Sequence, residues 1–199
     1  GINPYQQDED EILSRIQEAI GDWGKQLRQA YFYGSGVTSA NVAKVERSLQ
    51  TVCTKAEKIE VNNDVLAAAR SLCRHEAGIA CILGTGSNSC LYDGKKIVSN
   101  VGGFGFILGD EGSGAVLGKQ LFIDFLYKKI PPHLTKTLED KHGLSMTHIL
   151  EQTYRTQFPN RYMATFAPFV HQHRQEPYMQ QLLEQHFRDF FNRKTFCYP

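Results

Sequence analysis

The chain has 199 residues, which is enough for one domain, or two small ones, around a buried core. Hydrophobic residues make up 41% of it and charged residues 22%, the composition of an ordinary soluble globular protein. Its 22 basic and 21 acidic residues leave a formal net charge of +1, so we expect neither nucleic acid nor an acidic membrane as a partner.

The cysteines and the chain ends add further expectations. The five cysteines are widely spaced without a C-x-x-C pair, which predicts neither a disulfide framework nor a zinc site and favours a cytoplasmic location. The first residues lack the pattern of a signal peptide, and the apolar stretches are shorter than the roughly 20 residues that cross a bilayer. We also expect a partial chain, since no initiator Met is present.

The first 75 residues alternate between helical and strand patterns. Helical periodicity is found at residues 8–19, 42–52 and 65–70, and short runs typical of strands at residues 29–33 and 58–61. This alternation predicts an open α/β layer with a parallel sheet.

Consecutive strands are expected next. Residues 79–83 form a continuous apolar run that is typical of a buried strand. Residues 88–92 and 96–99 follow, and Asp93-Gly94 between them is a strong hairpin signal.

The remainder of the chain has mainly helical patterns. Three helices are expected at residues 117–127, 146–154 and 179–191. Pro131-Pro132 is expected to end the first of them. The change of pattern near Gly78 predicts two domains, residues 1–77 and residues 78–199.

A loop with two glycines follows the apolar strand and has the sequence Gly84-Thr85-Gly86-Ser87-Asn88-Ser89. Its glycines allow a close approach of the backbone to a ligand, and successive N–H groups in such a turn can bind phosphate. It is neither a P-loop nor a dinucleotide fingerprint, because both require a helix directly after the loop. From the hexamer alone, a phosphate loop and a plain hairpin turn both stay open.

Asp64 stands between a predicted strand and a predicted helix. Such a carboxylate can be the N-cap of the helix, where it accepts a backbone N–H. It can also be a general base that takes a proton from a hydroxyl group attacking phosphorus. Position alone does not separate the two interpretations.

Glycines are dense from Gly102 to Gly114. Each loses much conformational entropy on folding, so the segment must need positive φ angles or a close approach of its backbone to a ligand. Asp110 and Glu111 precede the next helix, where capping and the binding of a hydroxyl group are both reasonable.

Taken in this order, the clusters resemble the N-acetylglucosamine kinase branch of the actin, heat-shock-ATPase and sugar-kinase superfamily, which is often grouped under the BadF/BadG/BcrA/BcrD ATPase family. The resemblance is carried by Asn63-Asp64, by residues 82–88 and by residues 102–113. It implies an α/β fold of the actin-like, ribonuclease-H-like type with two lobes, both incomplete here.

The resemblance also implies roles for individual residues. Asp64 falls where the family keeps the catalytic base that deprotonates the sugar 6-hydroxyl. The implied phosphate-binding residues are Gly84, Thr85, Gly86 and Ser87. The implied sugar-binding residues are Ser35, Asn88, Gly102, Gly103 and Asp110. Phe104 stands where relatives often carry an aromatic residue, frequently Trp.

The implied ligands are ATP, an amino sugar and Mg²⁺, and the metal would be held through water and phosphates, without direct protein ligands. The family's first glycine-rich hairpin and its adenosine-binding turn have no counterpart in the sequence. We therefore expect the isolated 199 residues to bind ATP poorly and to turn over little. A homodimer is also possible for this family.

Several alternatives stay open. The substrate can be N-acetylmuramate or glucosamine in place of N-acetylglucosamine, since the residues near C2 and C3 of the sugar are not decisive. The protein can also be a degenerate, non-catalytic sugar-binding or ATPase-family protein. An ATPase activator of a dehydratase, from the same broad family, would need a cysteine cluster for iron and sulfur, which the sequence lacks.

Overall fold

The computed structural model describes residues 2–199. Two compact units divide the chain. The first contains the residues up to Ala80 together with Tyr92–Val98, and the second contains Cys81–Leu91 and Ser99–Pro199. The chain passes from one unit to the other within strands, and each unit is described below by itself.

The first unit has the alternating order that the sequence predicts. Its elements are helix α1 (Glu9–Ile20), the 3₁₀-helix η1 (Gly21–Gln26), strand β1 (Gln29–Gly34), helix α2 (Val42–Val52), strand β2 (Lys58–Asn63) and helix α3 (Asp64–Cys73). Strands β1 and β2 are parallel, with Gln29 opposite Lys58 and Gly34 opposite Asn63. The predicted parallel sheet is thereby confirmed.

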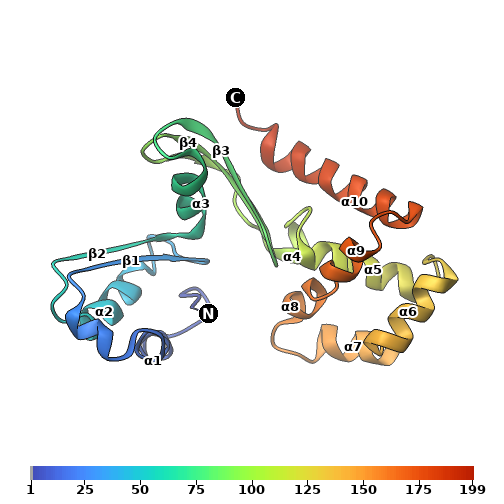
Figure 1. Ribbon diagram of the computed structural model, residues 1–199, viewed down its shortest axis with the longest axis horizontal. Helices are drawn as coiled ribbons and strands as arrows, with labels where there is room; N and C mark the ends of the chain where they lie inside the picture. The colour runs from blue at the N-terminus through green and yellow to red at the C-terminus, as the bar shows by residue number, and fades with distance from the viewer. Residues whose placement is uncertain (1) are drawn as a thin grey trace. The chain divides into compact units, whose positions relative to one another are not determined.

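Helices cover both faces of this strand pair. Figure 1 shows α1 and α2 against one face of β1 and β2, and α3 against the other. Helix α1 begins with a capping box in which Asp8 and Glu11 satisfy each other's backbone N–H groups. Ile12 and Ile16, one turn apart, are buried on its inner side.

A three-stranded sheet follows in the order β3-β4-β5. Its strands are β3 (Ala77–Leu83), β4 (Ser87–Asp93) and β5 (Ile97–Asn100). The predicted turn joins β4 to β5: Asp93 N–H donates to the carbonyl oxygen of Lys96 at 3.1 Å, and Gly94 has φ +92°.

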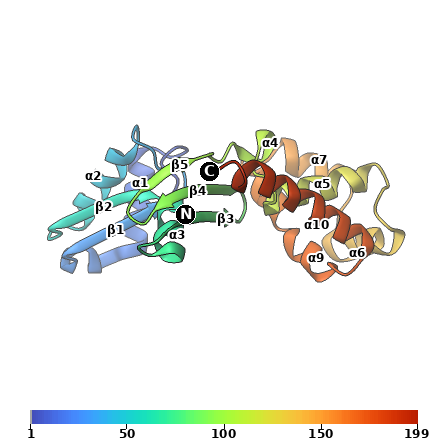
Figure 2. The ribbon, with the colours of Figure 1, turned by 90° about the horizontal axis from the view of Figure 1, so that it is seen from above.

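The rest of the second unit is helical. Its helices are α4 (Gly105–Leu108), α5 (Gly114–Leu126), α6 (Pro132–His142), α7 (Met146–Tyr154), α8 (Pro159–Ala164), α9 (Ala167–Gln172), α10 (Pro177–Phe190) and the π-helix η2 (Phe191–Thr195). Figure 2 shows α5 to α10 gathered into one helical group.

Pro132 begins a helix, whereas the sequence pattern assigned it to the end of one. Helix α5 ends at Leu126, and α6 starts at Pro132. Proline suits this position because the first helical N–H has no partner within the helix.

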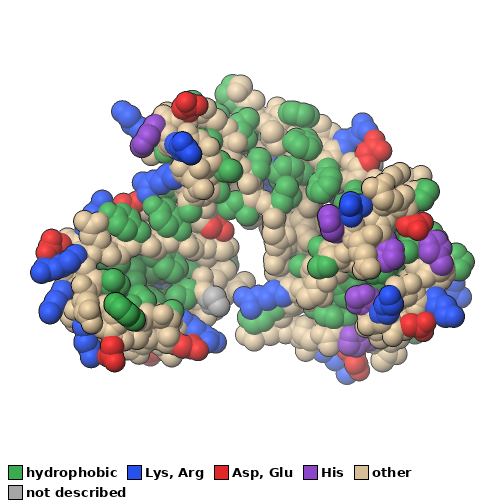
Figure 3. Space-filling model, in the orientation of Figure 1, with side chains coloured by type: hydrophobic (Ala, Val, Ile, Leu, Met, Phe, Trp, Pro, Cys, Tyr) green, Lys and Arg blue, Asp and Glu red, His purple; other side chains and the backbone are tan. Residues whose placement is uncertain are grey.

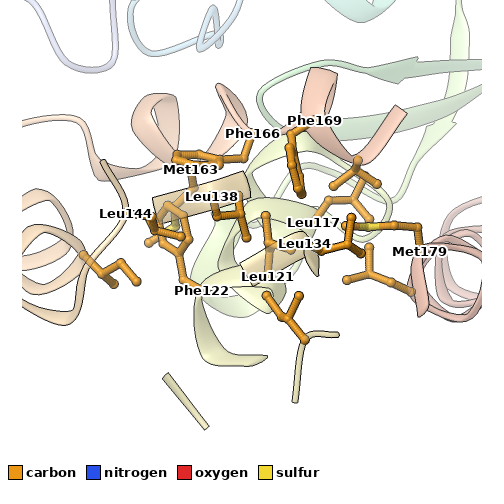
Figure 4. Close-up of a cluster of buried hydrophobic side chains, with 14 of the residues drawn as sticks. Leu117, Leu121, Phe122, Leu134, Leu138, Leu144, Met163, Phe166, Phe169 and Met179 are labelled. Carbon is orange, nitrogen blue, oxygen red and sulfur yellow. The ribbon is translucent and has the colours of Figure 1, made fainter. Parts of the chain in front are cut away.

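The core of the second unit forms around α5. Figure 4 shows Leu121 and Phe122 of α5 among Leu134 and Leu138 of α6, with Phe166 nearby. The rings of Phe122 and Phe166 meet edge to face, with centroids 4.8 Å apart. This apolar packing anchors α5 among the helices around it.

Charges of both signs are dispersed over the visible face of each unit in Figure 3, as the balanced composition predicts. Among residues 2–199, no helix combines the length and the apolar character needed to span a membrane.

Candidate active site

Asp64 is the first residue of α3, and it is not the N-cap. The cap is Asn63, whose side-chain oxygen accepts the N–H of Leu66 at 2.8 Å. The capping interpretation of Asp64 is therefore wrong, because its neighbour performs that task. The backbone N–H groups of Val65 and of Asp64 itself are hydrogen-bonded to the Asp64 carboxylate.

The environment of Asp64 changes its acidity. Partial burial raises the pKa of this carboxyl group, while its backbone hydrogen bonds lower it by less. A raised pKa brings the carboxylate nearer to the basicity that proton abstraction at neutral pH requires.

Ser35 lies at the same edge of the first unit as Asp64. Gly34, the last residue of β1, is opposite Asn63, the last residue of β2. Because the strands are parallel, the turn with Ser35 and the start of α3 both follow carboxyl ends, the usual place for ligands in α/β sheets. Asn41 fastens this turn: its Nδ2 donates to the carbonyl oxygen of Gly36 at 2.8 Å.

In the second unit, the loop between β3 and β4 is hydrogen-bonded to the start of α5. The N–H of Gly114 donates to the carbonyl oxygen of Gly84 at 2.9 Å, and the N–H of Ala115 to that of Thr85 at 3.1 Å. Within the described chain, the N–H groups of Thr85 and Gly86 have no partner, and Thr85 is exposed. Two adjacent donors therefore remain for an anion.

Asp110 connects this loop to the glycine-rich segment. Its side chain accepts backbone N–H groups from Ser87 and from Gly105, although burial outweighs them and raises the pKa of the carboxyl group. Asp110 has φ +59°, a strained conformation for a residue other than glycine.

Gly86 is required by the close approach of Asp110. A Cβ atom at Gly86 would lie 2.7 Å from Oδ2 of Asp110. A Cβ atom at Gly103 would lie 3.3 Å from the carbonyl oxygen of Ser87 and 3.9 Å from Nδ2 of Asn88. These residues therefore form one closely packed cluster in the second unit.

The structure thus divides the predicted site residues between the units. Asp64 and Ser35 share an edge in the first unit. Those brought together in the second are Gly84, Thr85, Gly86, Ser87, Asn88, Gly102, Gly103 and Asp110.

Lys194 and Tyr198, near the C-terminus, also contact the second-unit cluster. Lys194 Nζ donates to the carbonyl oxygen of Gly102 at 2.5 Å, and the N–H of Val101 donates to the hydroxyl oxygen of Tyr198 at 3.1 Å. No local sequence pattern indicates either residue, because the contacts with Gly102 and Val101 span 92 and 97 positions of the chain. Arg193 pairs with Glu111 at 2.9 Å.

The second-unit cluster contains hydrogen-bond donors of the kind that bind an anion. Besides the free N–H groups of Thr85 and Gly86, the buried hydroxyl of Ser87 has no hydrogen-bond partner in the described structure. Such a set of neutral donors can bind an anion without a net positive charge. No group of three or more side chains suited to a metal ion occurs among the residues described.

Among solved structures, the chain is similar to a candidate N-acetylglucosamine kinase from Porphyromonas gingivalis. The two are 44% identical with a TM-score of 0.95, and the match covers 100% of this chain and 71% of that one. The chain belongs to the N-acetylglucosamine kinase family. No protein-family model matches the sequence, and no curated protein matches it significantly.

A second structure shares the fold of this kinase family member. It is a candidate N-acetylglucosamine kinase from Chromobacterium violaceum, 21% identical with a TM-score of 0.67, and the match covers 93% of this chain and 71% of that one. The predicted mixed α/β fold of a sugar kinase is therefore confirmed, while the actin-like, two-lobed arrangement stays a prediction.

Proposed function

We propose that the protein is an ATP-dependent kinase that phosphorylates N-acetylglucosamine, or a close amino sugar, at O6. The family relationship supports the reaction class. The observation that carries the proposal is the position of the Asp64 carboxylate. Asn63, and not Asp64, caps helix α3, and Asp64 lies at the carboxyl edge of the strands, near Ser35.

In the proposed reaction, Asp64 is the general base. It takes the proton of the sugar 6-hydroxyl as that oxygen attacks the γ-phosphorus of ATP. The bond between the γ-phosphorus and the bridging oxygen breaks, and ADP leaves with that electron pair. General-base assistance typically contributes about 10²–10⁴-fold to such a rate.

The second-unit cluster would position the reactants. The N–H groups of Thr85 and Gly86 would donate to phosphate oxygens, and Mg²⁺, held through water and phosphates, would neutralise their charge. Asn88 and Asp110 would bind sugar hydroxyl groups, since a carboxylate has acceptor sites beyond the two that Ser87 and Gly105 occupy. Positioning of this kind is the main requirement of phosphoryl transfer.

The domain division at residues 77 and 78, the cytoplasmic location, a homodimer and the low activity of the isolated 199 residues stay predictions.

Steady-state kinetics of the full-length gene product test the proposal. We expect ADP formation that depends on N-acetylglucosamine, and a fall in kcat of about 10²-fold or more in Asp64→Asn. Asp140→Asn, which changes an exposed aspartate of α6, is the matched control and should leave kcat unchanged.

Parallel assays with glucosamine and N-acetylmuramate identify the preferred sugar. The proposal is wrong if none of the three sugars stimulates ADP formation, or if Asp64→Asn retains full activity.

A further inference from the structure

Lys194 is a buried cation that the proposed reaction does not use. Its side chain is 1% exposed, and it lies in the π-helix η2 that directly follows α10. Burying an ammonium group is costly unless charges or dipoles nearby compensate for it. Its surroundings therefore indicate what the group does.

Three groups of the glycine-rich segment surround the ammonium group. Nζ donates to the carbonyl oxygen of Gly102 at 2.5 Å, and it lies 4.7 Å from the centre of the Phe104 ring. The carboxylate oxygen Oε2 of Glu111 is 3.8 Å away, at ion-pair distance. Lys194 thus contacts residues on both sides of the short helix α4: Gly102 and Phe104 before it, and Glu111 after it.

The bond to Gly102 fixes the direction of one peptide group. In a trans peptide the C=O and N–H groups point in opposite directions. Holding the carbonyl of Gly102 on Lys194 therefore directs the N–H of Gly103 away from the ammonium group. This N–H has no partner in the described part of the protein, and Gly103 lies beside Ser87 and Asn88.

Gly102 can accept this arrangement because it is a glycine. Its φ is +88°, a conformation that side chains rarely adopt. Because glycine has little intrinsic preference among backbone conformations, the orientation of the Gly102–Gly103 peptide depends on the contacts that hold it.

Tyr198, which follows η2 in the chain, contacts the same region of the second unit. Its hydroxyl group donates to the carbonyl oxygen of Ser89 at 2.8 Å and accepts the N–H of Val101 at 3.1 Å. The backbone carbonyl of Lys194 itself accepts the hydroxyl of Ser89. Figures 1 and 2 both draw this end of the chain, in red, beside strand β4.

We propose that Lys194 is a positioning residue for sugar binding, an inference that rests on the proposed function. It holds the Gly102–Gly103 peptide so that the N–H of Gly103 is presented as a hydrogen-bond donor to an oxygen of the sugar. Tyr198 holds the residue before that peptide. Neither side chain contacts the sugar itself.

Kinetics of Lys194→Met in the full-length protein test this inference. The methionine retains the length of the side chain and removes the ammonium group. We expect KM for N-acetylglucosamine to rise about tenfold, since a hydrogen bond to a charged group is lost, while KM for ATP and kcat change less than about twofold. Lys136→Met, at an exposed position of α6, is the matched control and should resemble the wild type.

This pattern separates positioning from a general loss of structure. Partial unfolding would lower the active fraction, and with it kcat, but would leave KM for the sugar unchanged. Tyr198→Phe provides a milder second variant in case Lys194→Met does not fold, and a rise of about threefold in KM for the sugar is expected from it. An unchanged sugar KM in both variants overturns the inference.

Hydrogen–deuterium exchange provides a readout that needs no activity. Within residues 101–105, the amides of Val101 and Gly105, which donate to Tyr198 and Asp110, should exchange about tenfold faster in Lys194→Met than in the wild type, and those of α7 should be unaffected. If the wild type lacks kinase activity, the proposed function fails, yet faster exchange at residues 101–105 still supports the role of Lys194 and unchanged exchange contradicts it.

Discussion

Asn63 and Asp64 are adjacent and chemically similar, but they perform different tasks. Asn63 caps α3, and Asp64 begins it with a partly buried carboxylate. The sequence identified Asp64 as a candidate but could not exclude the capping role, because both residues are good caps. Only the hydrogen bond to Leu66 decides which residue is the cap.

The raised pKa of Asp64 predicts how stability responds to its removal. A raised pKa means that the folded protein holds this proton more tightly than the unfolded chain does, so the charged form is unfavourable to folding above that pKa. Asp64→Asn should therefore have a Tm at neutral pH equal to or above that of the wild type. A clearly lower Tm, measured by thermal denaturation, would show that the carboxylate stabilises the fold.

The same shift predicts the acid side of the activity profile. A general base must be ionised, so kcat/KM should fall as the pH drops through the raised pKa of Asp64, above the value of about 3.9 for an ordinary aspartate. The pH dependence of kcat/KM for the sugar measures this. Activity that persists unchanged down to pH 4 would argue against Asp64 as the base.

Tertiary contacts of the helical part of the second unit were harder to predict than the hairpin between β4 and β5. The hairpin at Asp93-Gly94 has a local signal, and the structure contains it. Helix α6 was not predicted, because Pro132 was interpreted as a terminator although it also suits a first helical position. The contacts of Lys194 with Gly102 are set by tertiary folding and leave no local pattern.

The crossing of α5 and α8 depends on Gly118. A Cβ atom there would lie 1.9 Å from the backbone oxygen of Met163, so the two helices would have to separate. Gly118→Ala should cost about 1–3 kcal/mol of unfolding free energy, measured by urea denaturation. Gly84→Ala is the matched control, since its Cβ atom would meet nothing within 4 Å. Equal stability of the two variants would contradict this packing.

Helices α5 and α10 are joined by a partly buried hydrogen bond. The hydroxyl of Tyr178 donates to Oδ2 of Asp124 at 2.8 Å, and the other carboxylate oxygen accepts from Gln120 at 3.1 Å. Tyr178→Phe should lower the unfolding free energy by about 1–3 kcal/mol, because Asp124 stays buried with one partner fewer.

Tyr127→Phe is the control for this prediction, because Tyr127 is 73% exposed. Denaturation curves should give a lower unfolding free energy for Tyr178→Phe than for Tyr127→Phe. If Tyr178→Phe is as stable as Tyr127→Phe, the hydrogen bond to Asp124 contributes nothing to stability.

For the whole molecule, each of the two compact units holds candidate residues of its own. The first has the proposed base at the carboxyl edge of a parallel strand pair, and the second has free N–H groups beside a glycine-rich segment. The two clusters could be predicted from the sequence, because each depends on a local motif of turn and glycine residues. The supporting residues Lys194 and Tyr198 could not.

Identification of the reaction product tests the central claim most directly. The full-length gene product is incubated with ATP, Mg²⁺ and N-acetylglucosamine, and the sugar is examined by correlated ¹H and ³¹P NMR. We expect a phosphorus signal coupled to the two protons on C6. A sugar that stays unphosphorylated, or that carries phosphate on another hydroxyl group, would contradict the account.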